Sequence, residues 1–242
     1  MYTSLKFLSL AALLGLAAAA PANNTSSDGG SGGGGGGGGA RIVVKNQCGY
    51  DLNIGKLTNG QSSPETSSVS QGSEKTYNVD GKWQGRFWGR KSGGDNPVAG
   101  AANPASLAEF TFKGSGGNDY YDVSFVDGFN LPISIEPINP SKSGGSDNGE
   151  QYHCGKPTCS KLPECPGDLK GDDGTCKSAC SKYNTEEFCC SGSHNTPDTC
   201  PPNKFSKAVK DSCPDAYSYA YDDKKSTYMC QSEGYTVTFC PN

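Results

Sequence analysis

The sequence predicts a mainly β protein, an antiparallel β-sandwich that carries a disulfide-rich subdomain of loops and short helices. Short runs rich in β-branched and aromatic side chains recur along residues 41–140, separated by Gly, Asn and Pro. The chain has twelve cysteines, and most of them crowd between Cys154 and Cys200, where apolar residues become scarce. A segment of that composition cannot be held by a hydrophobic core alone, so it depends on disulfides.

The first segment, residues 1–20, is predicted to be a signal peptide. Lys6 supplies a positive charge, and an apolar run that ends in small residues follows it. This run is too short for a comfortable membrane anchor, and the sequence has no other run of about 18 apolar residues. We therefore expect a secreted protein without a membrane span, located outside the cell or in the cell wall.

Residues 21–40 are predicted to form a disordered, Gly-rich linker. Consecutive glycines have no side chains to bury and lose much entropy on ordering. Asn23 and Asn24 each begin an N-x-Ser/Thr sequon, so one of them can carry a glycan, and an unmodified spacer is an equal alternative.

Residues 41–242 are predicted to form one domain. The sandwich takes residues 41–153 and 221–242, and the disulfide-rich subdomain takes residues 154–220. The chain has a net charge of −4, which matches neither nucleic acid nor an anionic membrane, because both select basic surfaces. A neutral or cationic partner, or a site that needs carboxylates, fits this charge better.

The strands are expected where β-branched or alternating runs occur. In chain order these runs are ARIVVKNQC (40–48), EKTYNV (74–79), KWQGRFWGR (82–90), LAEFTF (107–112), DYYDVSFV (119–126), LPISIEPI (131–138) and YTVTFC (235–240). The subdomain is expected to contain short helices. In NKFSKAVKDSC, Asn203 is a plausible N-cap, and Phe205, Ala208 and Val209 fall on one helical face.

The even number of cysteines and the export signal together predict six disulfides. Cys189 and Cys190 are adjacent, and a bond between neighbours strains the peptide that joins them. We therefore expect each of them to bond to a different partner, although spacing alone leaves many pairings open.

Several strings resemble the thaumatin-like protein family. They are IVVKNQC, GRFWGR, SLAEFTF, DYYDVSFVDGFNLPISIEP, CPDAYSYAYDD and YTVTFCPN, and in this order they cover nearly all of residues 41–242. The resemblance implies a flattened β-sandwich of about eleven strands with an acidic cleft beside the disulfide-rich part. It also implies the cysteine partners: Cys48–Cys240, Cys154–Cys230, Cys159–Cys213, Cys165–Cys176, Cys180–Cys189 and Cys190–Cys200.

The sequence departs from the family after GRFWGR. The usual member has sixteen cysteines, and the two missing pairs belong to a small subdomain at this point. Here the stretch is only KSGGDNPVAGAANPA and contains no cysteine. This departure puts one wall of the implied cleft in doubt.

The resemblance further implies five cleft residues, namely Arg86, Glu109, Asp122, Asp127 and Asp222. We expect Glu109 to be the catalytic acid and Asp127 the base or nucleophile of a glycoside hydrolase, because crowded carboxylates raise one another's pKa. Arg86, Asp122 and Asp222 would bind substrate or set its orientation. Asp122 and Asp127 are five positions apart, so both can face one cleft only if the chain turns near Gly128.

Two function classes remain open from the sequence. The first is a secreted protein that binds the β-1,3-glucan of cell walls or a related polysaccharide, either by binding alone or with hydrolysis as an endo-β-1,3-glucanase. The second is a non-catalytic glucan-binding, antifungal or enzyme-inhibitor protein, because the same motifs also define the fold. His153 and His194 lack a surrounding nucleophile motif, and the cysteines form no C-x-x-C pair, so we expect no metal and no cofactor. We expect a monomer.

Overall fold

The structure is a computed structural model, and it describes residues 39–141, 150–171 and 173–242. The predicted signal peptide, most of the linker and the sequons at Asn23 and Asn24 lie outside the described residues. The first strand, β1 (Ala40–Asn46), begins at Ala40, one residue before the predicted start of the domain. No helix among the described residues is long and apolar enough to cross a membrane.

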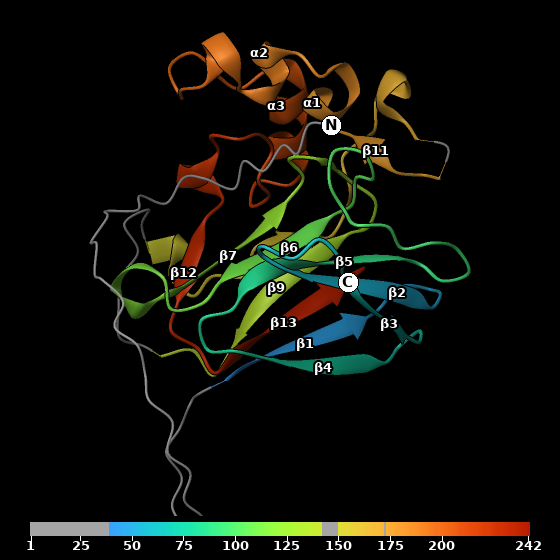
Figure 1. The fold of residues 1–242 in the computed structure, drawn as a ribbon, viewed down its shortest axis with the longest axis vertical. Coiled ribbons are helices and arrows are strands. Elements are labelled where there is room, and N and C mark those ends of the chain that lie inside the picture. The colour runs from blue at the N-terminus through green and yellow to red at the C-terminus, as the bar shows by residue number, and fades with distance from the viewer. Residues whose placement is uncertain (1–38, 142–149, 172) are drawn as a thin grey trace, which may run out of the picture. The chain divides into compact units, whose positions relative to one another are not determined.

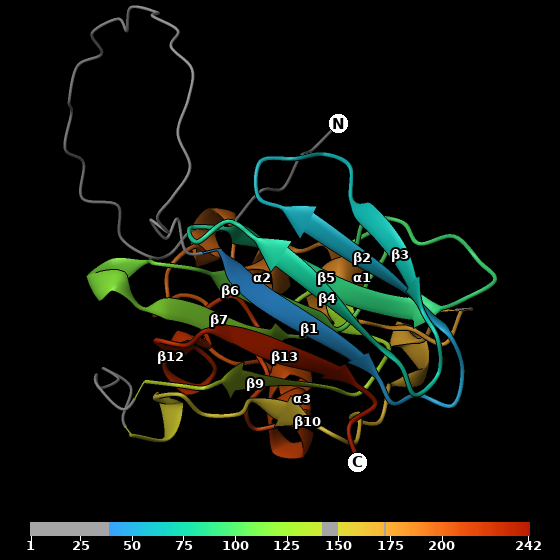
Figure 2. The same ribbon diagram turned by 90° about the horizontal axis from the view of Figure 1, so that it is seen from below.

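Two main sheets form the sandwich (Figures 1 and 2), which confirms the predicted fold class. The five-stranded sheet has the order β10 (Thr158–Cys159), β9 (Ile133–Ile138), β13 (Gly234–Phe239), β1 and β4 (Glu74–Val79). The six-stranded sheet has the order β12 (Tyr228–Cys230), β7 (Asp119–Ser124), β6 (Leu107–Thr111), β5 (Gln84–Lys91), β2 (Leu52–Thr58) and β3 (Glu65–Val69). A small third sheet joins β8 (Gly128–Phe129) to β11 (Cys176–Lys177).

One strand pair differs from the antiparallel arrangement that the sequence predicts. β1 and β13, the first and last strands, run parallel, with Ile42 opposite Tyr235 and Val44 opposite Val237. Parallel pairing is possible here because no hairpin links the two strands. β13 instead enters the five-stranded sheet after β12, which belongs to the other sheet.

Sequence inspection also missed three strands of the six-stranded sheet, β2, β3 and β12. β3 lies at the sheet edge and has the polar sequence ETSSV, with only Val69 buried. An edge strand of this kind lacks the alternating apolar residues that reveal a half-buried strand. β12 is only three residues long.

Aromatic side chains fill the space between the two main sheets. Phe110 of β6 lies 5.3 Å from Tyr235 of β13, measured between ring centroids, and Tyr121 of β7 lies 4.8 Å from the same tyrosine. Phe87 and Val123 are also fully buried there. Because side chains alternate along a strand, the neighbours of these core residues must face the other side of the six-stranded sheet.

All six disulfides that the resemblance implies are confirmed, and the twelve cysteines are all paired. Cys190 adopts a left-handed backbone conformation (φ 50°) directly after the helix that contains Cys189. The two adjacent cysteines therefore point apart, and Cys189 bonds to Cys180 while Cys190 bonds to Cys200. The Cys48–Cys240 bond closes a loop with a sequence separation of 192 residues. In the chain-entropy picture it contributes about 5 kcal/mol to stability.

The subdomain contains three short α-helices, α1 (Ala179–Tyr183), α2 (Glu186–Cys189) and α3 (Lys204–Ser212) (Figure 1). Single 3-10 turns lie at Ser115–Gly117, Glu150–Tyr152, Gly167–Leu169, Gly192–His194 and Asp223–Lys225. The side chain of Asn203 accepts hydrogen bonds from the amides of Phe205 and Ser206, so the predicted N-cap of α3 is confirmed. Phe205, Ala208 and Val209 lie on one face of α3, as predicted, because all three line the same cavity. Ala208 is exposed there, whereas Ser206 is buried beside Phe205 and Val209.

Candidate functional site

Three of the five predicted site residues lie side by side across neighbouring strands. Arg86 of β5 is directly opposite Glu109 of β6, and Glu109 is directly opposite Asp122 of β7. Directly opposed residues of antiparallel strands point to the same face, with Cβ atoms about 4.5–5.5 Å apart. The register therefore produces a row of one guanidinium and two carboxyl groups.

This row faces away from the sandwich core. The adjacent cross-strand pairs Phe87–Ala108 and Phe110–Tyr121 are buried between the sheets. The alternation of side chains then turns Arg86, Glu109 and Asp122 toward the subdomain side of the six-stranded sheet, where all three are partly exposed. Ser124, two residues after Asp122 and on the same face, forms a hydrogen bond with Glu109.

Asp127 joins this row because the chain turns at the end of β7. The amide of Gly128 donates to the carbonyl of Phe125 at 2.9 Å, which closes a turn over residues 125–128. Gly128 has φ of 129°, and a Cβ at this position would lie 2.1 Å from the carbonyl oxygen of Cys176, so only glycine fits. The turn that the sequence required near Gly128 is present.

The carbonyl of Asp127 anchors this turn to the subdomain. It accepts hydrogen bonds from the amide of Ser178 and the hydroxyl of Ser181, at 3.2 and 2.7 Å. The carboxyl group of Asp127 lies close enough to Arg86 and Glu109 to alter the charge balance of the row. We call Arg86, Glu109, Asp122 and Asp127 the acidic cluster.

The acidic cluster has strongly perturbed protonation equilibria. Burial raises the pKa of Glu109 to about 7, an effect that Arg86 opposes and that the charge of Asp127 reinforces. Burial, together with the nearby Glu109 and Asp223, raises the pKa of Asp122 well above its usual range. Burial also raises the pKa of Asp127, against the pull of Arg86. Three carboxyl groups around one guanidinium thus retain protons to higher pH than isolated side chains do.

Asp122 holds the least favourable place for a negative charge. Its Oδ1 atom is buried, and within the described part of the chain no group donates a hydrogen bond to it. A buried, unsolvated carboxylate oxygen strongly favours the protonated form. Asp122 therefore keeps its proton to higher pH than an isolated aspartic acid does.

The carboxylate of the fifth predicted residue, Asp222, is bound by other side chains of the protein. Asp222 is only 8% exposed, and its Oδ2 atom lies 3.0 Å from the ammonium of Lys210. The same oxygen accepts hydrogen bonds from the amide and hydroxyl of Ser218, at 3.1 and 2.8 Å. Asp222 thus holds together the segment that connects α3 to β12.

Asp223, which sequence reasoning did not select, interacts more directly with the acidic cluster. Its charge raises the pKa of Asp122, and its carboxylate accepts a hydrogen bond from the hydroxyl of Tyr217. Tyr217 itself pairs with the end of β7, because its amide donates to the carbonyl of Val123 at 2.8 Å. The sequence shows two adjacent aspartates, Asp222 and Asp223, but it does not indicate which of them lies near the acidic cluster.

The shortened segment after β5, residues 92–106, folds over the face of the sheet beside the acidic cluster. Its Ala99 and Ala105 are buried against Trp88 and Leu107, which are themselves buried. Two arginines of β5 bind its backbone: Arg86 donates to the carbonyl of Ala99 and Arg90 to that of Asn103, each at 2.7 Å. Gly100 lies next to the carboxyl group of Asp127, since a Cβ on Gly100 would be 4.0 Å from Asp127 Oδ2.

The described residues contain no group of three or more His, Cys, Asp or Glu side chains arranged to hold a metal ion. The chemistry that the acidic cluster itself offers is proton transfer between carboxyl groups of different pKa, next to one fixed positive charge.

Comparison with known proteins places these features in context. The sequence model of the Thaumatin family matches residues 46–241. Thaumatin-like protein 1 of Pyrus pyrifolia is 41% identical over 230 residues, which cover 84% of this chain and 91% of that protein. A protein of Prunus avium named glucan endo-1,3-beta-glucosidase is 38% identical, with the same coverage of each chain. Among solved structures, a GH family 64 laminaripentaose-producing beta-1,3-glucanase from Paenibacillus barengoltzii matches with a TM-score of 0.52 at 13% identity, covering 84% of this chain and 75% of that one.

Proposed function

This chain belongs to the thaumatin family, and from that premise we propose that it is a secreted protein whose acidic cluster binds β-1,3-glucan of cell walls. The observation that carries the proposal is the alignment of Arg86, Glu109 and Asp122 on three neighbouring strands, with Asp127 added by the turn. The name of the Prunus avium relative, a glucan endo-1,3-beta-glucosidase, gives the substrate class. The six disulfides fit an extracellular protein.

We further propose that the acidic cluster hydrolyses the bound glucan, with Glu109 as the general acid. Because the pKa of Glu109 is raised to about 7, this side chain is protonated at mildly acidic pH and has a proton to give to the leaving oxygen. Asp127 acts as base or nucleophile: burial raises its pKa, but the neighbouring Arg86 opposes this shift and favours the ionised form.

Arg86 and Asp122 support these two groups. Arg86 holds the segment 92–106 in place through Ala99 and balances the charge of the carboxylates. Asp122, when protonated, can donate a hydrogen bond to Glu109 or to a sugar hydroxyl, which an ionised carboxylate cannot do. Asp222, which the sequence predicted to bind substrate, instead stabilises the segment between α3 and β12 through its ion pair with Lys210.

The alternative is a glucan-binding protein without turnover, such as an antifungal or enzyme-inhibitor protein. One observation favours this alternative. The carboxylate of Asp222 is already bound by Lys210 and Ser218, which leaves fewer groups to bind substrate. The alternative predicts binding of insoluble β-1,3-glucan with no release of reducing ends.

Two parallel measurements distinguish these functions. The first is retention of the protein on insoluble β-1,3-glucan, and the second is release of reducing ends from linear β-1,3-glucan. General acid catalysis typically contributes ~10²–10⁴-fold, so Glu109→Gln should lower turnover by that order while retention persists. Glu74→Gln, which changes an exposed glutamate of β4 in the other sheet, should leave both unchanged.

The outcomes have different meanings. Retention without turnover by the unmodified protein would reject the enzyme and leave the binding protein. Unchanged turnover in Glu109→Gln would reject Glu109 as the acid. Absence of both retention and turnover would reject glucan as the ligand.

A further inference from the structure

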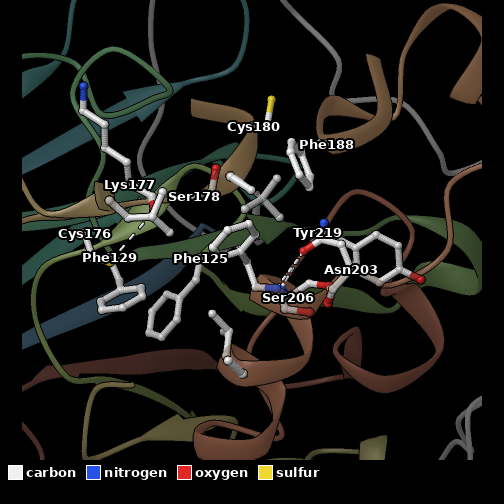
Figure 3. Close-up of a pocket in the computed structure, with 18 of the residues that line it drawn as sticks. Phe125, Phe129, Cys176, Lys177, Ser178, Cys180, Phe188, Asn203, Ser206 and Tyr219 are labelled. Carbon is white, nitrogen blue, oxygen red and sulfur yellow. Dashed lines mark hydrogen bonds between the residues drawn. The ribbon is translucent and has the colours of Figure 1, made fainter. Parts of the chain in front are cut away.

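A cavity of about 70 Å³ lies between the end of β7 and the helices of the subdomain (Figure 3). Its walls are mainly apolar. Phe125 and Phe129 approach it from the sandwich, while Phe188 and Phe205 line it from the subdomain. Exposed residues such as Ala208 also line it, so the cavity opens to the surface. No residue of the acidic cluster is among those that line it.

Several polar groups around the cavity are already bound to other parts of the protein, and the exposed Glu164 lines it as well. Asn203 caps α3 and also accepts from the hydroxyl of Ser206, through its carbonyl. The hydroxyl of Ser218 donates to Asp222 at 2.8 Å. Figure 3 shows the amino group of Lys177 pointing away from the aromatic rings. Between the aromatic rings a ligand therefore meets carbon atoms and sulfur, and a charge buried there would lose its hydration without gaining a partner. A charge at the open mouth of the cavity would instead meet Glu164 or Lys177.

A line of aromatic rings connects the cavity with the protein surface. Phe188 and Phe205 lie 5.8 Å apart, measured between ring centroids, and both lie within 5.9 Å of Tyr183. Tyr183 is 37% exposed, the large apolar side chain that is most open to solvent among the described residues. Aromatic faces of this kind favour flat or ring-shaped apolar partners.

The size of the cavity limits what it can take. An engineered cavity of about 150 Å³ with apolar walls stays dry and binds benzene. The cavity here has a volume of about 70 Å³, so it holds part of a single ring, and the remainder of the ligand stays at the open mouth.

The cavity and the acidic cluster share one turn of the backbone. Phe125, Val126 and Gly128 line the cavity, while Asp127, between them, belongs to the acidic cluster. The carbonyl of Asp127 is held by Ser178 and Ser181, and Ser178 lines the cavity as well. A ligand in the cavity would therefore contact the residues that precede and follow Asp127 in the chain.

We infer that this cavity is a binding site for a small, uncharged, apolar ligand no larger than one six-membered ring with a short substituent, and that its occupant acts on the turn that carries Asp127. This site goes beyond the proposed glucan function and does not depend on it. The occupant would be a free small molecule, because the enclosed volume is too small for a lipid chain or a peptide segment.

The test is a titration of the isotope-labelled full chain with toluene, followed by NMR. Toluene should produce saturable chemical-shift changes at the amides of residues 125–128 and at the methyl group of Ala208. Acetate and methylammonium, which carry a charge but no ring, should produce no shifts at the amides of residues 125–128 at the same concentrations. Ala208→Phe fills the mouth of the cavity and should abolish the toluene-dependent shifts.

The matched control is Ser212→Phe, which adds the same ring to an exposed position on the same helix, away from the cavity lining. This variant should bind toluene like the unmodified protein. Equal binding by the unmodified protein and Ala208→Phe would overturn the proposal, and so would shifts confined to other regions.

Xenon provides a measurement that needs no variant. In crystals of the unmodified protein under xenon pressure, a xenon atom among Phe125, Phe129 and Phe205 would support the site. A cavity that takes no xenon and shows no toluene-dependent shifts would reject it. Neither measurement uses glucan, so failure of this inference would leave the proposed glucan function standing.

Discussion

The raised pKa of Glu109 makes a specific prediction about stability. For a carboxyl group, a folded-state pKa above the unfolded value means that the folded protein binds the proton more tightly than the unfolded chain. Glu109 has an ordinary value of 4.5 and a folded value of about 7. The contribution of Glu109 to the free energy of unfolding is therefore largest at low pH. It falls as the pH rises from about 4.5 to about 7 and then levels off.

The size of this fall follows from the two values. Between pH 5 and pH 8, the difference in proton binding removes about 2–3 kcal/mol from the free energy of unfolding through Glu109 alone. For a domain of this size, that corresponds to about 5–10 °C in melting temperature. Asp119, Asp122 and Asp127 also have raised pKa values because of burial, so their contributions have the same sign.

The assay is chemical denaturation at pH 5 and pH 8, with the disulfides intact, for the unmodified protein and for Glu109→Gln. Glutamine has nearly the same shape and never ionises, so the variant should lose about 2–3 kcal/mol less than the unmodified protein over this range. The exposed variant Glu74→Gln should behave like the unmodified protein. Equal losses in Glu109→Gln and the unmodified protein would refute the raised pKa of Glu109, and with it the argument that this residue is the proton donor.

Three further predictions concern the parts of the fold that position the acidic cluster. Asp222→Asn should lower stability by about 1–3 kcal/mol in a denaturation experiment, because the half-buried Lys210 loses its charged partner. The control Asp198→Asn, at an exposed position, should change little, and a loss of glucan retention at unchanged stability would return Asp222 to the substrate site. Gly128→Ala should destabilise the protein by about 2 kcal/mol or more and reduce the secreted yield, because the alanine Cβ would collide with the carbonyl of Cys176. A normal melting temperature in this variant would contradict the turn geometry. Replacing Cys48 and Cys240 together by alanine should cost about 2–5 kcal/mol, and an unchanged denaturation midpoint would show that the disulfide adds nothing to stability.

Local patterns in the sequence were sufficient for much of the fold. The alternation in runs such as LAEFTF identified strands and their buried faces, because a strand places successive side chains on opposite sides. Asn203 followed by an amphipathic run identified the start of α3. The motif strings identified the family and, through it, all six disulfides, which no spacing argument could pair.

The tertiary structure decided what depends on partners far apart in the chain. Alternation gives the face of Glu109 but not its neighbours, and only the strand register places Arg86 and Asp122 on either side of it. The polar edge strand β3 and the parallel pairing of β1 with β13 follow from the assembly of whole sheets, which leaves no local signature.

The same distinction separates the site residues from one another. Asp222 and Asp223 are adjacent and chemically identical in the sequence, but folding brings Lys210 to the first and Tyr217 to the second. The shortened segment 92–106 has no cysteine to hold it, and it is fixed instead by Trp88, Arg86 and Arg90 from β5. The sequence by itself determined which residue types are available to the acidic cluster, whereas their charge, burial and partners were decided by tertiary contacts, because electrostatic energy depends on distance in space and not on distance along the chain.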